Sequence, residues 1–141
     1  MSISFSSESP DFKLNDEPRV KKWITTIVTS QGMAVGTIGY FFCSDSYLIN
    51  VNRTYLNHDT FTDIITFDYA VGNLVSGDIM ISVERVRENA ALFHTSFEQE
   101  LLRVIIHGIW HLLGQGDKSE SEATEMRNKE NSSLALWKTI L

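Results

Sequence analysis

The sequence predicts an α+β fold, in which a small mixed β-sheet is covered by helices. Segments typical of strands lie mostly early in the chain and segments typical of helices mostly late, with some alternation between the two. One predicted helix, near residues 97–113, is apolar on nearly all sides and is therefore expected to be buried. A length of 141 residues suits a single domain, 1–141, with a sizeable core.

The first part of the chain is predicted to contain two strands and two helices. In order, these are a strand over residues 2–6, a helix from Asp16 to about Gly32, a strand over Val35–Cys43 and a helix from Ser44 or Asp45 to about Leu56. Residues 2–6 alternate in the way typical of an edge strand. The first helix begins with acids and Pro18 in its first turn, and the second strand is rich in β-branched and aromatic residues.

The second part is predicted to begin with a turn and then to form two strands and three helices. These are a turn at Asn57-His58-Asp59, strands over Thr62–Phe67 and Leu74–Val83, and helices over Glu84–Phe93, Phe97–Leu113 and from Ser119 to about Lys138. Ser96 with Gln99, and Ser119 with Glu122, have the spacing of capping boxes at the start of the last two helices.

The net charge of −6 is unfavourable for a protein that binds nucleic acid mainly through lysine and arginine. Two small basic clusters, Arg19-Lys21-Lys22 and Arg85-Arg87, are interpreted as solvated helix faces. No secretory signal and no apolar run long enough to span a bilayer is recognised, so no membrane partner is expected. The single cysteine, Cys43, lies in an apolar run and is predicted to be buried and inert, which suits a cytoplasmic location.

The most informative segment is His107-Gly-Ile-Trp-His111-Leu-Leu-Gly114, followed by Asp117. Histidines four residues apart on a helix lie on the same face, which is the spacing a divalent metal needs to bind two imidazoles. Gly114 can end the helix in a left-handed turn, so that the chain doubles back and brings Asp117 into range as a third ligand. Three protein ligands leave one position open for water, as in catalytic sites.

The alternative for this segment is a chance pair of histidines satisfied within the core. Gly108 costs a helix about 1 kcal/mol relative to alanine, which indicates that something packs closely at that point. Gly108 also occupies the position of the general-base glutamate in the zinc-protease pattern His-Glu-x-x-His. Without that base, peptide hydrolysis by the protease mechanism is not expected.

Taken together, these motifs resemble the YbeY family of bacterial rRNA maturation factors, which are metal-dependent endoribonucleases. The match covers four parts of the chain. In the predicted metal-binding helix it includes His107, Gly108, His111, Leu112 and Gly114. Earlier in the chain it includes Asn52, Tyr55, Thr62, Asp63, Thr66 and Phe67, then Gly77-Asp78-Ile79 in the next predicted strand, and in the last predicted helix it includes Glu125-Met126. The resemblance implies a small sheet beside a buried metal-binding helix, zincin-like in its paired histidines.

The function that the resemblance implies is single-strand-specific endoribonuclease activity in 16S rRNA 3′-end maturation and ribosome biogenesis. His107 and His111 would be catalytic through a metal-bound water, and His107, His111 and Asp117 would hold one divalent metal. Zinc is expected, with Ni²⁺ or Mn²⁺ as alternatives. The implied partners are ribosomal RNA and the small ribosomal subunit, and no DNA is expected.

The sequence departs from the family pattern at two positions. Asp117 stands ten residues after His107, where the family has a third histidine, and an aspartate oxygen is an acceptable zinc ligand. Leu56 stands where the family usually has an arginine thought to bind the RNA phosphate. Arg53, His58 and Lys118 are the cations that we consider as replacements, and a solvated surface role is the alternative for each.

Two other functions stay open from the sequence. One is a non-catalytic, metal-binding ribosome-assembly factor, which Leu56 and the acidic charge favour. The other is a metal-dependent hydrolase of another substrate. Asp63 and Asp78 are candidates for orienting the metal ligands through hydrogen bonds, with satisfaction of turn amides as the alternative.

Overall fold

The protein has the predicted α+β architecture, with four strands and five helices in the part of the chain that the structure describes. The structure is a computed structural model and describes residues 2–56 and 62–140. In chain order the elements are β1 (Ser2–Ser7), α1 (Glu17–Ser30), β2 (Ala34–Cys43), α2 (Asp45–Tyr55), β3 (Ile64–Asp68), β4 (Leu74–Ser82), α3 (Val83–Leu92), α4 (Phe97–Leu112) and α5 (Glu120–Trp137). The turn predicted at residues 57–59 lies outside the described residues.

The sheet is mixed, with strand order β1-β2-β4-β3. β1 pairs with β2 and β2 with β4 in parallel, whereas β3 is antiparallel to β4. The prediction that the first strand forms an edge is confirmed, and β3 forms the opposite edge. Each parallel pair requires a crossover connection, which α1 supplies between the first two strands.

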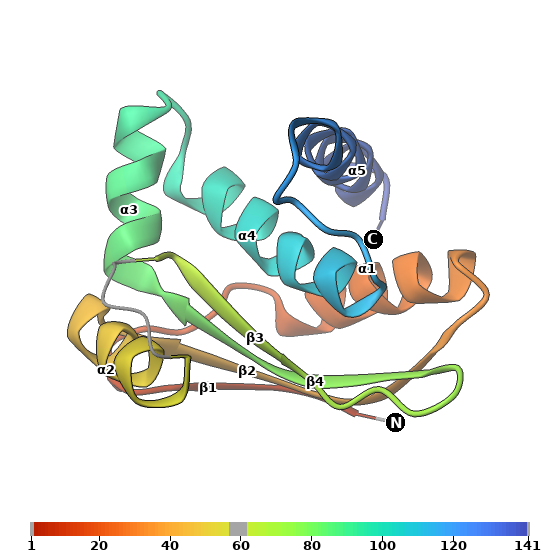
Figure 1. Ribbon diagram of the computed structural model, residues 1–141. Coiled ribbons are helices and arrows are strands. Elements are labelled where there is room, and N and C mark those ends of the chain that lie inside the picture. Colours follow the sequence, from red (N-terminus) through yellow and green to blue (C-terminus); the bar gives the residue numbers. More distant parts are fainter. Residues whose placement is uncertain (1, 57–61, 141) are drawn as a thin grey trace.

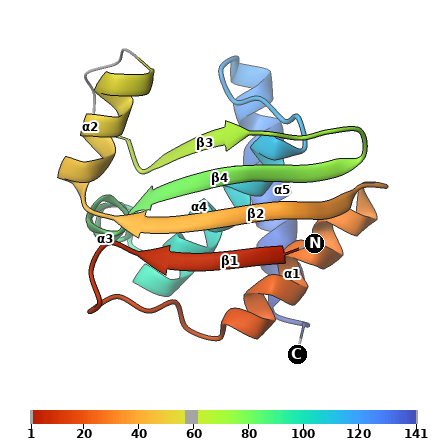
Figure 2. The same ribbon diagram turned by 90° about the horizontal axis from the view of Figure 1, so that it is seen from below.

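The helices divide unequally between the two faces of the sheet. α1, α4 and α5 lie over one face and α3 stands at its end (Figure 1), whereas the view from below shows the other face with α2 at one end (Figure 2). The main core lies between the sheet and the larger group of helices, and a smaller cluster of Cys43, Leu48 and Ile65 lies beneath α2. Burial raises the pKa of the Cys43 thiol to about 12, so this cysteine is buried and inert, as predicted.

Of the two capping boxes predicted from the sequence, one forms completely and the other only in part. Ser119 and Glu122 form a complete capping box at the start of α5. At the start of α4 the Ser96 hydroxyl accepts a hydrogen bond from the Gln99 backbone N–H at 3.1 Å. The reciprocal bond from the Ser96 backbone to the Gln99 side chain does not form, so this cap is half of the predicted box.

In each of the two basic clusters, at least one arginine makes contacts that hold parts of the fold together. Arg19 donates to the carbonyl oxygens of Trp137 and Ile140 at 2.6 and 2.9 Å, and so fixes the last turns of the chain to α1. Arg85 pairs with Asp45 at 3.0 Å and with Glu88 at 2.9 Å. Neither arginine is a solvated side chain of the kind expected from the sequence.

The helix α4 is the centre of the fold. Its buried residues face the sheet on one side and α5 on the other, and the Tyr40 hydroxyl of β2 donates to the Ile105 carbonyl at 2.8 Å. A Cβ atom on Gly108 would lie 3.0 and 3.1 Å from side-chain atoms of Ile79 and Ile64, so the close packing predicted at this glycine is present. Apolar as α4 is, no helix among the described residues is long and apolar enough to cross a membrane.

We predict that Gly108→Val lowers the stability of the fold. Valine would place three extra carbons against Ile79 and Ile64, and overpacking of this kind costs about 1–3 kcal/mol. The measurement is thermal unfolding followed by circular dichroism. The matched control is Asn128→Val on the exposed side of α5, which should shift the midpoint little; equal midpoints for both variants would contradict close packing at Gly108.

Candidate metal centre

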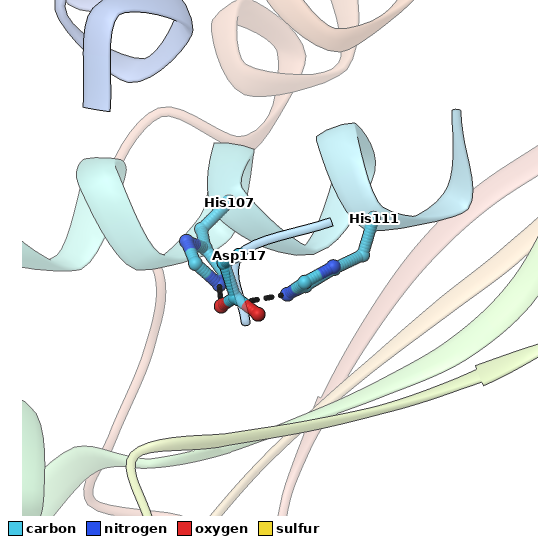
Figure 3. Close-up of side chains that lie close together, drawn as sticks. All are labelled: His107, His111 and Asp117. Carbon is cyan, nitrogen blue, oxygen red and sulfur yellow. Dashed lines mark ion pairs between the residues drawn. The ribbon is translucent and has the colours of Figure 1, made fainter. Parts of the chain in front are cut away.

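Three side chains converge in front of α4. The Nε2 atoms of His107 and His111 each lie 3.3 Å from the same Asp117 oxygen, Oδ2 (Figure 3). The two imidazoles come from successive turns of one helix, as their spacing predicts, and Asp117 approaches from the loop after α4. One ligand atom from each of the three residues lies within 4.8 Å of the others, so the cluster could hold a metal ion.

The turn after α4 places Asp117. Gly114 has a φ of 98°, its N–H donates to the His111 carbonyl at 3.0 Å, and the Gln115 N–H donates to the Trp110 carbonyl at 2.9 Å. This pair of bonds is the Schellman pattern, which reverses the chain direction at the end of a helix. The sequence-based expectation of a left-handed turn at Gly114 is therefore confirmed.

His107 is held by a buried carboxylate of α5. Its Nδ1 lies 2.6 Å from Glu130 Oε2, and the Arg103 guanidinium donates to Glu130 Oε1 at 2.8 Å. Glu130 is only 6% exposed. Because the carboxylate accepts, Nδ1 carries the proton, and the lone pair on Nε2 points toward Asp117.

His111 is held by backbone. Its Nδ1 lies 3.0 Å from the Gln115 carbonyl oxygen, which can only accept, so the proton again lies on Nδ1. The Gln115 side chain is fixed in turn, since its Oε1 accepts from Lys129 at 2.6 Å and its Nε2 donates to the Gly116 carbonyl at 2.9 Å. Both histidines therefore present Nε2 to the same point.

The electrostatics of the site follow from these contacts. Burial lowers the pKa of His107, but its hydrogen bond to Glu130 and the charges of Glu130 and Asp117 outweigh burial and raise the pKa overall. Burial alone would raise the pKa of Glu130, yet His107 and Arg103 lower it, so this carboxylate is ionised. Burial raises the pKa of Asp63, and the charge of Asp63 in turn raises the pKa of His107.

The donor set suits a divalent ion. Two imidazole lone pairs and a carboxylate oxygen repel one another unless a cation lies between them. Ligand atoms held tetrahedrally at about 2.0–2.1 Å from zinc lie roughly 3.3–3.4 Å from one another. Both histidine-to-aspartate distances, at 3.3 Å, match that edge.

A cavity of about 330 Å³ adjoins the cluster, with His107 and Asp117 in its lining. Its remaining lining comes from the residue before β3, from α3 and the residue after it, and from α4 and α5: Asp63, Asn89, Phe93, Glu100, Arg103, Val104, Ala123, Met126, Arg127 and Glu130. The cavity is large enough for a small organic ligand. The site therefore has room beside the ligands.

The two described cations among those proposed from the sequence do not line this cavity. Arg53 is in the last turn of α2, Lys118 follows Asp117, and neither lines the cavity; His58 lies outside the described residues. Leu56 ends α2 and is 41% exposed. The two arginines in the cavity lining, Arg103 and Arg127, were not anticipated.

The two aspartates considered as orienting groups differ in position. Asp63 lines the cavity beside His107. Asp78 lies on the opposite face of the sheet, in a second hollow with Tyr69 and Tyr55. Neither aspartate bonds a ligand histidine among the described contacts; Glu130 and the Gln115 carbonyl do so instead.

The fold and the site define a class of small α+β proteins with a paired-histidine helix and a carboxylate from the following loop, a set that could hold a metal ion. The family model described as "Endoribonuclease YbeY" matches residues 3–138, so the chain belongs to the YbeY family. This membership supports an endoribonuclease role, that of a hydrolase acting on RNA.

Individual relatives agree with the family match. The chain is 49% identical over 135 residues to an "Endoribonuclease YbeY" of Flavobacterium johnsoniae, with 96% of each chain covered. It is 50% identical over 135 residues to one of Christiangramia forsetii, covering 96% of this chain and 94% of that one. The solution structure of TM1509 from Thermotoga maritima has a TM-score of 0.66 and 27% identity, covering 98% of this chain and 93% of that chain.

We predict that Glu130→Gln weakens metal binding by about 10- to 100-fold, the usual effect of removing a carboxylate that orients a ligand histidine. The amide lacks the charge that fixes the His107 proton on Nδ1. The measurement is a zinc titration by calorimetry against a competing chelator. Glu125→Gln, on the exposed side of α5, is the control and should bind zinc like the wild type; equal affinities in all three proteins would contradict the role of Glu130.

Proposed function

We propose that this protein is a metal-dependent endoribonuclease, specific for single strands, that matures the 3′ end of 16S rRNA during ribosome biogenesis in the cytoplasm. The observation that carries the proposal is the convergence of His107, His111 and Asp117 beside a cavity, in a chain of the YbeY family. The rRNA substrate comes from the family resemblance. The small ribosomal subunit is the proposed partner.

The proposed cofactor is one Zn²⁺ ion held by His107, His111 and Asp117. Two imidazoles and one carboxylate at tetrahedral spacing suit zinc, and Ni²⁺ and Mn²⁺ are the alternatives. When bound, the ion supplies a Lewis acid for a phosphoryl oxygen and acidifies water. The proposed catalytic role of the two histidines is to position that ion.

The remaining residues of the site bind and orient rather than react. Glu130 and the Gln115 carbonyl keep both imidazoles in the tautomer that leaves Nε2 free for the ion. Arg127 lines the cavity with a half-exposed side chain and is the cation best placed to meet an RNA phosphate there. Gly108 leaves no carboxylate at the position of a protease base, so peptides are not the proposed substrate.

We predict one zinc ion per chain in the wild type and a loss of affinity of at least about tenfold in Asp117→Ala, because one of three protein ligands is removed. Metal content by mass spectrometry and zinc titration are the measurements. Lys118→Ala is the neighbouring control and should keep the metal, since a protonated lysine has no lone pair to donate. Loss of zinc in the lysine variant with retention in the aspartate variant would exclude Asp117 as ligand.

We predict that the zinc-loaded wild type cleaves a single-stranded fragment from the 3′ end of 16S rRNA, and that His111→Ala does not. Removing one imidazole removes the ion that activates the phosphodiester. The measurement is product mapping on the labelled fragment, with a duplex RNA and a peptide as substrates that should stay intact. Equal decay with both proteins would indicate a contaminating nuclease and would favour the non-catalytic assembly factor.

A further inference from the structure

Glu100 is a buried acid without an assigned partner. It is 6% exposed, and its carboxylate accepts no hydrogen bond from any residue within 2–56 and 62–140. It lines the cavity beside the metal cluster, and burial raises its pKa more than the charge of Arg103 lowers it. The carboxylate oxygens are not among the buried polar atoms that lack a partner, so they open into the cavity, where they are placed to accept hydrogen bonds from a ligand.

The position of Glu100 along α4 relates it to the metal cluster. Glu100 and His107 are seven residues apart, which is about two helical turns or roughly 10 Å along the axis, so both lie on the same face. Val104 lies between them and also lines the cavity. A ligand bound to the metal through one end can therefore reach Glu100 with the other.

The walls between these two points suit a flat aromatic ligand. Phe93, the residue that follows α3, lines the cavity and is 56% exposed, which leaves a ring face open for stacking. Val104 and Met126 are apolar, and Arg127 has a side chain that is 58% exposed. An aromatic wall, a buried acceptor and a cation are the groups that bind a base, its edge and a phosphate.

We propose that this cavity binds a guanine base of the RNA strand next to the metal, with Glu100 accepting from the guanine N1–H and N2–H₂ groups. The inference rests on the proposed function and names the base that the same site selects. Phe93 stacks on the guanine ring, and Arg127 holds a phosphate of the same strand. The charge of Asp63 raises the pKa of Glu100, and a second carboxylate in the cavity lining further favours a ligand that presents hydrogen-bond donors.

The choice of guanine follows from the donors that each base presents. Two adjacent N–H donors on one pairing edge match the two oxygens of a carboxylate, and guanine alone presents them. Adenine, cytosine and uracil each place an acceptor beside their donor on that edge, and this acceptor would be repelled by the carboxylate. A buried polar group that meets the wrong edge stays unpaired, which makes such discrimination strong.

The test is calorimetric binding of 5′-GMP, 5′-IMP and 5′-AMP to the zinc-loaded protein. The three nucleotides share ribose and phosphate, so any contribution of the metal cancels in the comparison. We expect GMP to bind about tenfold or more tightly than AMP, with IMP weaker than GMP because it lacks the N2 amino group. Equal affinity for GMP and AMP in the wild type overturns the proposal, and this comparison depends on no variant.

Two variants assign the contacts. Glu100→Gln should remove most of the preference for GMP, whereas Phe93→Ala should weaken GMP and AMP alike. Glu98→Gln, an exposed acid two residues closer to the start of α4, is the matched control and should keep the preference. An unchanged preference in a folded Glu100→Gln protein overturns the role of Glu100.

The cleavage assay separates the inference from the proposed function. Cuts that depend on His111 and lie next to guanosines in the wild type, but lose this preference in Glu100→Gln, support both. Cuts that depend on His111 and ignore base identity leave the nuclease in place and overturn the guanine site. Selective GMP binding without any RNA cleavage supports the guanine site and contradicts the nuclease.

Discussion

The contact between Glu130 and His107 joins the two helices on which the site depends. Glu130 is an acid in the buried side of α5, and both of its oxygens are bound by α4, one by Arg103 and one by His107. Arg103 and His107 are one turn apart, so the bidentate contact fixes how α5 is rotated against α4. A buried ionic contact of this kind contributes little net stability, but removal of one partner leaves a costly unpaired charge.

The position of Asp117, the proposed third ligand, follows from this contact. The loop that carries Asp117 is short and runs from the end of α4 to the start of α5, two helices whose relative placement is fixed. A Cβ on Gly116 would lie 2.5 Å from Glu122 Oε2, so the loop passes close against the cap of α5. With its ends and its middle held, the loop brings the Asp117 carboxylate to within 3.3 Å of both imidazoles.

The sequence predicted what depends on local periodicity and missed what depends on how helices face each other. The strands, helix ends, Gly114 turn and two histidines follow from alternation, caps and spacing along one segment. The partners of Glu130 could not be assigned because they lie on another helix, and the role of Glu100 could not be assigned because the cavity that it lines is formed by several helices. A signal was nevertheless present: each acid occupies a buried position in a helix, Glu130 between Met126 and Trp137, where an apolar residue is expected. Arg53 and Lys118 were chosen by their proximity in sequence to Leu56 and Asp117, and they do not line the cavity, because its lining depends on how separate helices pack.

The charge of the proposed site explains why recognition there would depend on shape and hydrogen bonds. A divalent ion with two neutral imidazoles and the Asp117 carboxylate carries one positive charge less than it would with a third imidazole. The cavity adds Asp63, Glu100 and Glu130 against Arg103 and Arg127, within a protein of net charge −6. General attraction to phosphates is therefore weak, and indiscriminate binding to RNA is disfavoured. Under that constraint, selectivity has to come from contacts that only a correctly placed, unpaired nucleotide can make, which is consistent with a preference for single strands.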